Sequence, residues 1–153
     1  MRNLFLLICF VSFLVDCKHP MKQKTTLVKQ GIQGNVQLLT GNAMPMKDAP
    51  KAVSNGFETI VYIYPLLNLN DIAKFAENGI YKQLPGKHLF AQKTNNKGEF
   101  LMHLPEGRYS LFVGYKNGFF ANISNTEGYV QPILIEKQKV ANLTITVDAD
   151  AVY

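Results

Sequence analysis

The sequence predicts an all-β fold, a seven-stranded sandwich of two sheets with one short helix inserted between its strands. Three observations support this class. Short runs rich in β-branched and aromatic residues recur from residue 31 onward, with Gly, Pro, Asn or Asp between them. In several runs apolar and polar residues alternate, as in a strand with one buried face. A single stretch, residues 70–79, has helical spacing instead. Regularly spaced strands of this kind are typical of a sandwich.

The first part of the domain is predicted to contain two strands separated by a long loop. Residues 31–39 form the first strand, with its apolar side chains available to one face. Residues 40–56 are rich in Gly and Pro and are expected to be a loop. Residues 59–64 are the strongest β run of the chain, and Pro65 ends it.

A helix of two to three turns is predicted after the second strand. Asn70 and the aspartate after it can cap its first turn, and Ile72, Phe75 and Ala76 follow at the spacing of one helix face. An Asn-Gly pair ending at Gly79 is a typical stop signal. We therefore expect a small helix inserted between strands.

The second part is predicted to consist of strands joined by tight turns. The strands are expected at 89–94, 100–104, 109–115, 130–136 and 142–148. Residues 95–98, Asn-Asn-Lys-Gly, are expected to be the turn of a hairpin, and 119–128 to be irregular. The last two strands are expected to pair with each other across the turn at 137–139.

The N-terminal segment has the composition of an export signal. A basic start is followed by an apolar run that is too short to span a bilayer as a helix and that ends near Cys17. Both cysteines of the chain lie within the first 17 residues, so a disulfide in the domain is not expected. We expect residues 1–16 to be a signal peptide, Cys17 to be lipidated, and 17–30 to be a basic tether. The position before a lipidated cysteine usually holds a small residue, but here it holds Asp16. If Cys17 is not lipidated, the alternative is a soluble periplasmic or secreted protein.

The formal net charge of +5 does not predict a nucleic-acid partner. Four lysines of the tether carry much of it, whereas from Gln30 onward there are 11 basic and 10 acidic residues. Binding to nucleic acid would need basic residues on the folded part. A basic arm beside a lipidated cysteine suits an anionic membrane surface, and a solvated linker explains it equally well.

Two turn segments carry a recognisable pattern. The first motif consists of Thr94, a polar turn, Gly98 and Phe100. The second motif follows it and consists of Leu104, Pro105, Gly107, Tyr109 and Leu111. Gly98 supplies the positive φ that a tight turn needs, and Gly107 serves the next reversal. The rings of Phe100 and Tyr109 are expected in the core between the sheets.

This pattern resembles the carboxypeptidase regulatory-like domain, a transthyretin-like sandwich, and the chain is similar to small lipoproteins of the Bacteroidetes type that carry this domain alone. The resemblance covers residues 31–153, which we expect to be the domain. It implies an accessory module of the bacterial envelope, anchored by lipid to the outer membrane, without catalysis or a cofactor of its own.

Candidate catalytic and metal sites are weak in this sequence. His103 and Glu106 have the spacing of a zinc-ligand pair, but no histidine follows them to complete a three-ligand site. The C-terminus lacks the Tyr-Arg-Gly-Ser motif of hydrolases of this fold that open a purine-derived ring. Asp148 and Asp150 are too few for calcium. We therefore expect no catalytic residues and no metal site, and keep a zinc-dependent or purine-ring hydrolase as the least favoured alternative.

The candidate binding surface is aromatic. Phe119, Phe120 and Tyr129 border the irregular segment 119–128. Adjacent residues of an extended chain point to opposite sides, so one phenylalanine is expected in the core and the other partly exposed. We expect a non-catalytic module that contacts another envelope protein or a glycan through loops or an open strand edge. The alternative is a stand-alone carbohydrate-binding domain.

Overall fold

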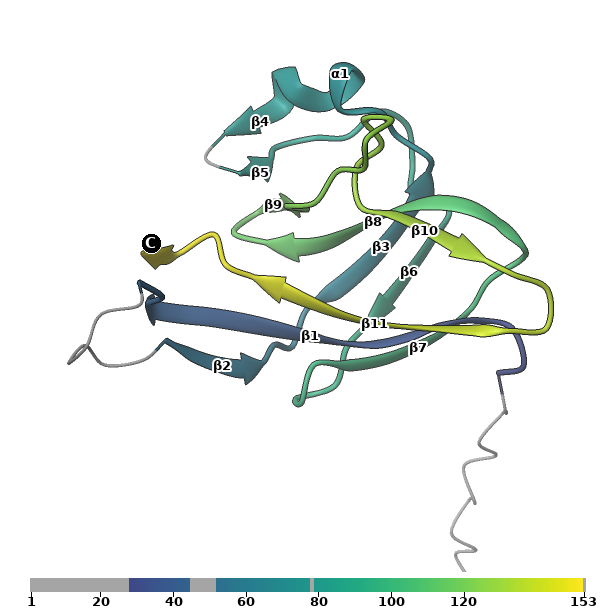
Figure 1. The fold of residues 1–153 in the computed structure, drawn as a ribbon, viewed down its shortest axis with the longest axis horizontal. Helices are drawn as coiled ribbons and strands as arrows, with labels where there is room; N and C mark the ends of the chain where they lie inside the picture. Colours follow the sequence, from purple (N-terminus) through teal and green to yellow (C-terminus); the bar gives the residue numbers. More distant parts are fainter. Residues whose placement is uncertain (1–27, 45–51, 78, 153) are drawn as a thin grey trace, which may run out of the picture.

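The computed structural model describes residues 28–44, 52–77 and 79–152 of the 153-residue chain, and these residues form two packed β-sheets (Figure 1). Sheet 1 contains β1 (Gly31–Asn42), β2 (Val53–Gly56), β7 (Glu99–His103), β11 (Val140–Val147) and β12 (Ala151–Val152). Sheet 2 contains β3 (Ile60–Pro65), β4 (Ala76–Glu77), β5 (Ile80–Tyr81), β6 (Phe90–Lys93), β8 (Gly107–Tyr115), β9 (Gly118–Phe120) and β10 (Pro132–Ile135). The predicted all-β sandwich with one short helix is confirmed.

The seven strands expected from the sequence correspond to β1, β3, β6, β7, β8, β10 and β11. The described residues contain five further strands, β2, β4, β5, β9 and β12, each of two to four residues. Three segments expected to lack strands therefore contain them, and one of these is the predicted helix 70–79, which includes β4. The expected loop 40–56 holds the end of β1 and all of β2, with 45–51 outside the described residues, and the expected irregular segment begins with β9.

The turns at 95–98 and 137–139 join strands of different sheets, so the predicted hairpin and the predicted pairing of the last two strands are both wrong. β6 pairs with β3 in sheet 2, whereas β7 pairs with β1 in sheet 1. Likewise β10 pairs with β8, whereas β11 pairs with β1 in parallel. Each turn reverses the chain, but the reversed strand packs face to face across the core instead of bonding edge to edge.

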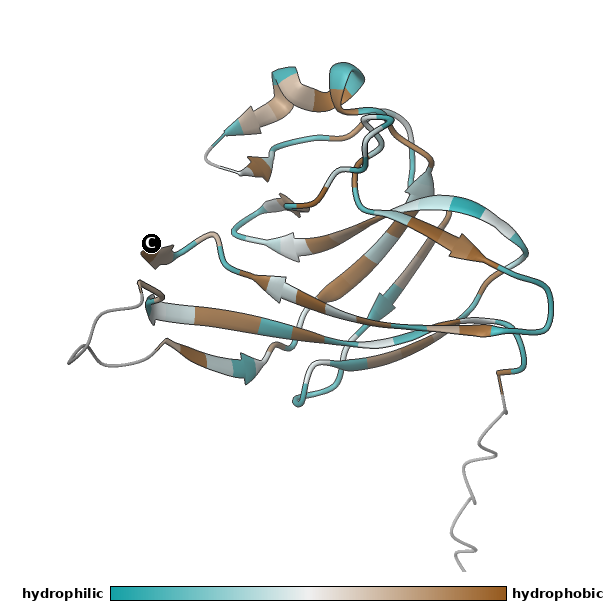
Figure 2. Cartoon of the chain, viewed as in Figure 1, coloured by the Kyte–Doolittle hydropathy of each residue, from teal (hydrophilic) through white to brown (hydrophobic). Residues whose placement is uncertain are grey.

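One long strand organises each sheet. In sheet 1 the long strand is β1. β11 runs parallel to it from Gly31↔Val140 to Leu38↔Val147, and β7 and β2 pair with the other side of β1. In sheet 2, β8 lies between β3 on one side and β9 and β10 on the other. Apolar and polar residues alternate along β11 (Figure 2), whereas β8 carries the consecutive apolar residues Leu111, Phe112 and Val113.

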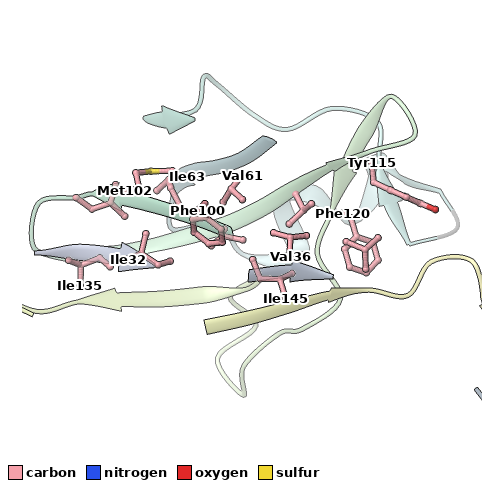
Figure 3. Packing of buried hydrophobic residues seen from close by; sticks show 14 of the residues in the cluster. Ile32, Val36, Val61, Ile63, Phe100, Met102, Tyr115, Phe120, Ile135 and Ile145 are labelled. Carbon is pink, nitrogen blue, oxygen red and sulfur yellow. The ribbon is translucent and has the colours of Figure 1, made fainter. Parts of the chain in front are cut away.

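The first core fills the space between the sheets, and both sheets contribute to it (Figure 3). Its buried members include Ile32, Val36, Val61, Ile63, Phe100, Met102, Leu104, Leu111, Val113, Phe120, Ile135 and Ile145. Alternate residues of β7 and β11 point into it, as their sequences predict.

A second core lies on the other face of sheet 2, under the segment that joins β3 to β6. Its buried members are Tyr64, Ile72, Tyr81, Leu84, Phe112, Ala121 and Val130. The expected helix is here, as α1 (Leu69–Ile72) followed by the 3₁₀ turn η1 (Ala73–Phe75). It is shorter than the predicted two to three turns, because Ala76 already belongs to β4. Its N-cap is Asn68, not Asn70: the Asn68 side chain accepts from the Asn70 amide at 3.0 Å. No helix in the described part of the chain is long and apolar enough to cross a membrane.

The residues of the recognised turn pattern have structural roles. Gly98 has φ +80° and Gly107 φ +152°, so both adopt conformations that favour glycine. Phe100 is buried in the first core, as expected. Tyr109 is half-buried against that core, and its hydroxyl donates to the Pro105 carbonyl at 3.2 Å across the turn.

Candidate functional site

The candidate site is a surface groove of about 410 Å³ at the end of the sandwich where β8 turns into β9. Its lining residues are Phe57, Tyr62, Gly114, Tyr115, Lys116, Asn117, Gly118 and Phe119. Four of these eight residues are aromatic. Three of these rings, Phe57, Tyr62 and Phe119, are partly exposed beside a short polar turn, whereas Tyr115 is buried in the first core.

The two aromatic walls come from different parts of the chain. On one side Tyr62 of β3 and Phe119 of β9 meet edge to face, with ring centroids 5.2 Å apart. On the other side Phe57 and Tyr115 meet in the same way at 5.8 Å. Phe57, Tyr62 and Phe119 are each half-buried, so part of each ring faces solvent. Edge-to-face pairs hold such rings in place and pre-form the walls.

Gly114 forms the floor of the groove because it has no side chain. A Cβ at this position would lie 3.3 Å from the Thr59 hydroxyl and 3.4 Å from the Tyr62 ring, so a larger residue would fill the space. The Thr59 hydroxyl also donates to the Gly114 carbonyl at 2.5 Å and ties the floor to the chain before β3. The turn beyond it holds Lys116 and Asn117 at φ +44° and +58°, which is the left-handed pair of a tight hairpin.

A hydrogen-bonded cluster joins two lining residues of the groove, Tyr115 and Lys116, to Asp150. Asp150 accepts from the Tyr115 hydroxyl at 2.5 Å and from the Lys116 ammonium at 2.5 Å. The Lys116 ammonium beside Asp150 holds the pKa of that carboxyl below its usual range, and the Tyr115 hydroxyl adds to this effect. Burial and the bond to Asp150 raise the pKa of Tyr115 to about 12. At neutral pH Tyr115 is therefore a neutral donor and Lys116 is engaged by a carboxylate.

The predicted binding residues lie in different places. Phe120 is buried in the first core and Phe119 is half-buried in the groove, which confirms that the two rings point to opposite sides. Tyr129 belongs to neither: its ring lies under the Arg108 guanidinium, at 5.2 Å, near the opposite end of β8. Phe119 is thus grouped with Phe57, Tyr62 and Tyr115, which the sequence analysis did not select.

The residues considered for metal binding or catalysis lie outside the groove, although Asp150 is bonded to two of its lining residues. His103 donates from Nδ1 to the Gln30 carbonyl at 2.8 Å, and Glu106 is exposed in the following turn. Asp148 accepts from the Asn122 amide at 3.1 Å. Within residues 28–44, 52–77 and 79–152, no three His, Cys, Asp or Glu side chains are grouped so as to hold a metal ion. Cys17 lies outside the described residues.

A larger depression of about 550 Å³ lies over β1, β7 and β11 of sheet 1. Its walls combine the polar side chains of Gln33, Asn35, Glu99 and Asn142 with the apolar residues Phe100 and Leu143. Two of the carboxamides donate within the protein, Gln33 to Asn142 at 2.5 Å and Asn35 to the Lys97 carbonyl at 2.6 Å, while the buried Oδ1 of Asn35 has no partner among the described residues. We regard the aromatic groove as the better site because its rings present apolar surface that has no partner in the described chain.

Comparison with known proteins does not assign the chain to a family. No family model matches it, and no curated protein matches its sequence.

Proposed function

We propose that this chain is a non-catalytic binding module of the bacterial envelope that contacts a glycan through the aromatic groove. The half-exposed rings of Phe57, Tyr62 and Phe119 around the open floor at Gly114 carry the proposal. Binding sites for small ligands combine apolar and aromatic walls with a few polar groups that fix orientation. Here Asn117 and Lys116 are the polar groups at the rim.

The composition of the groove favours binding over catalysis. Its eight lining residues contain no serine, cysteine or histidine, and the one amine among them, Lys116, is paired with Asp150, so they do not supply an activated nucleophile with a free base beside it. The carboxylate that is bonded to two lining residues, Asp150, is held ionised by Lys116. An acid catalyst would need the opposite shift in its pKa.

The placement of the groove suits a tethered module. Gln30, expected at the end of the tether, is fixed to the domain: its side chain donates to the Leu104 carbonyl at 3.0 Å and accepts from the Gln138 amide at 3.0 Å. These contacts lie beside the start of β8, whereas the groove lies at its end, about 26 Å away at 3.3 Å per residue. A chain attached through its N-terminus would present the groove away from the attachment point.

The envelope location and the family are part of the same proposal. The two-sheet sandwich and its turn pattern agree with a carboxypeptidase regulatory-like domain, and the N-terminal segment agrees with lipidation at Cys17. A palmitate analogue should label the wild type and not Cys17→Ser. Equal labelling of both would reject the lipid anchor and favour a soluble periplasmic or secreted protein.

A glycan array tests the groove. The fluorescently labelled Cys17→Ser variant of the full chain should bind a subset of immobilised bacterial glycans. Phe119→Ala should weaken that binding about tenfold or more, as expected for truncation of a central aromatic contact. Tyr129→Ala is the matched control, since it removes another half-buried ring at a distance from the groove, and it should leave binding within about twofold.

Two results would reject the glycan proposal. One is equal loss of binding in Phe119→Ala and Tyr129→Ala, which would place the contact elsewhere or indicate general unfolding. The other is an array without signal combined with cross-linking of the wild type in cells to one envelope protein. If Phe119→Ala abolished that cross-link, the groove would be a protein-binding site.

A further inference from the structure

The outer edge of β11 is an open strand edge with unusually little protection. Within the described residues, β11 has β1 as its one neighbour in sheet 1. The Gly31 amide donates to the Lys139 carbonyl at 3.0 Å, which sets the phase of the parallel ladder. In that phase the odd-numbered residues of β11 bond to β1, and the backbone groups of Val140, Asn142, Thr144 and Thr146 face outward.

β11 also lacks the features that natural proteins use to block edge pairing. Those features are short strands, charged side chains, proline and bulges. β11 has eight residues, contains no charge and no proline, and keeps an unbroken register with β1. The other edge strands differ: β6 ends in Lys93, β10 begins with Pro132, and β7 carries Glu99 and His103 at its ends.

The charges that flank β11 favour a second copy of the same chain as the occupant. The segment before the strand carries Lys137 in addition to the ion pair of Lys139 with Glu136, and the segment after it carries Asp148 in addition to Asp150, which is paired with Lys116. In an antiparallel pair of two β11 strands, the basic end of one copy lies beside the acidic end of the other. A parallel pair would put like charges together.

We propose that two copies of this chain associate through antiparallel pairing of their β11 strands, with a two-fold axis at Thr144. In this register Asn142 of each copy lies opposite Thr146 of the other on the outer face. Leu143 lies opposite Ile145 on the inner face. The outward backbone groups of Asn142, Thr144 and Thr146 then bond across the axis, and sheet 1 becomes continuous through both copies. Such an interface is isologous and closes after two subunits.

Sedimentation of the Cys17→Ser full chain tests the association. The wild-type sequence should sediment as a dimer, and Thr144→Lys and Thr144→Glu should each sediment as monomers because the axis puts like charges opposite. A mixture of the two variants should form the dimer again, because the introduced lysine and glutamate then face each other. Restored association also shows that both variants are folded. Gln92→Lys on the edge of β6 is the control and should remain dimeric.

Cysteine cross-linking tests the register. Thr144→Cys should form an intermolecular disulfide in the assembled protein, because residues directly opposite in a bonded pair have Cα atoms about 5.5 Å apart. Thr146→Cys should not cross-link to itself, but the double variant Asn142→Cys/Thr146→Cys should cross-link.

The proposal would be overturned by a wild-type chain that is monomeric at high micromolar concentration, or by dimers that survive both Thr144 variants. Neither outcome bears on the groove, which lies at the end of β8 and is tested separately.

Discussion

The two cores of this sandwich differ in how they are built, although both rest on β8. Leu111 and Val113 point into the first core, between the sheets, while Ser110 and Phe112 point into the second region under the helix. All four residues are buried. The first core is closed by another sheet, whereas the second is closed by α1, η1, β5, the segment around Leu84 and the loop after β9.

The difference shows that a strand in a sandwich can be buried on both faces by short irregular segments. The second core is richer in aromatic residues, which make up three of its seven buried members against three of fifteen in the first core. In it Phe112 meets Tyr64 and Tyr81 edge to face at 5.7 and 5.8 Å. The first core is mainly aliphatic. The aromatic layer supports Phe119, which contacts Tyr64 at 5.9 Å, so the second core also positions one wall of the groove.

Truncation of neighbouring residues on β8 compares the cores directly and should have the largest effect. Phe112→Ala and Leu111→Ala each remove a fully buried side chain, and each should lower the free energy of unfolding by about 3–5 kcal/mol. Phe112→Ala alone should also reduce the near-UV circular dichroism, because it removes the partner of two tyrosines. Urea unfolding measures the first effect. A loss of less than about 1 kcal/mol in the free energy of unfolding for Phe112→Ala would show that the second core is poorly packed and contributes little to stability.

The first core was largely predictable and the second was not, for a physical reason. Alternation in β7, β8 and β11 identifies the face that packs on the opposite sheet, and it correctly places Phe100, Met102 and Leu111. The second core draws on β5, a single helical turn and isolated loop residues. Helical spacing identified Ile72 and Phe75, which pack there, but Tyr81, Leu84 and Val130 come from segments too short for any periodicity to appear.

Which strands pair with each other was also only partly predictable from local sequence. The Asn-Asn-Lys-Gly turn correctly predicted a reversal, and Gly98 has the expected positive φ. The sequence of a turn does not state whether the next strand joins the same sheet or crosses to the other one. Buried Thr94 shows what decides it here: its hydroxyl donates to the Phe57 carbonyl and accepts from the Thr59 amide, both at 2.8 Å. This contact ties the crossing to a segment about 35 residues away. In the groove, Phe119 was found because it lies beside a loop, whereas Tyr62 lies within a strand.

Two glycines at positive φ, one in the crossing between the sheets and one above the second core, allow a second comparison. The expected change in the free energy of unfolding is intermediate in size. A Cβ on Gly98 would lie 2.0 Å from the Val36 carbonyl oxygen in the crossing between β6 and β7. Gly86, in the segment that covers the second core, has φ +73° and no atom within 4 Å of that position. We expect Gly98→Ala to cost about 3 kcal/mol and Gly86→Ala about 1 kcal/mol, because only the first adds a backbone clash to the conformational strain. Thermal unfolding of both variants checks the difference. Equal costs would mean that the crossing can relax as freely as the exposed segment.

The smallest effect concerns tyrosine ionisation, which also differs between the cores. In the second core, burial raises the pKa of Tyr64 and Tyr81. At the edge of the first core, burial and then the bond to Asp150 raise the pKa of Tyr115 from 10.0 to about 12. Because the folded state favours the protonated phenol, the contribution of Tyr115 to stability is full below pH 10. It is lost as the pH rises from 10 through about 12.

Tyr115→Phe isolates this contribution, since it keeps the ring against Phe57 and removes the proton that titrates. We expect the wild type to lose free energy of unfolding relative to Tyr115→Phe as the pH rises above 10, measured by urea unfolding at closely spaced pH values. Tyr64 and Tyr81 titrate in both proteins and cancel in the comparison. Parallel curves for the two proteins would show that Tyr115 has its ordinary pKa and that the bond to Asp150 does not hold Tyr115 at the groove.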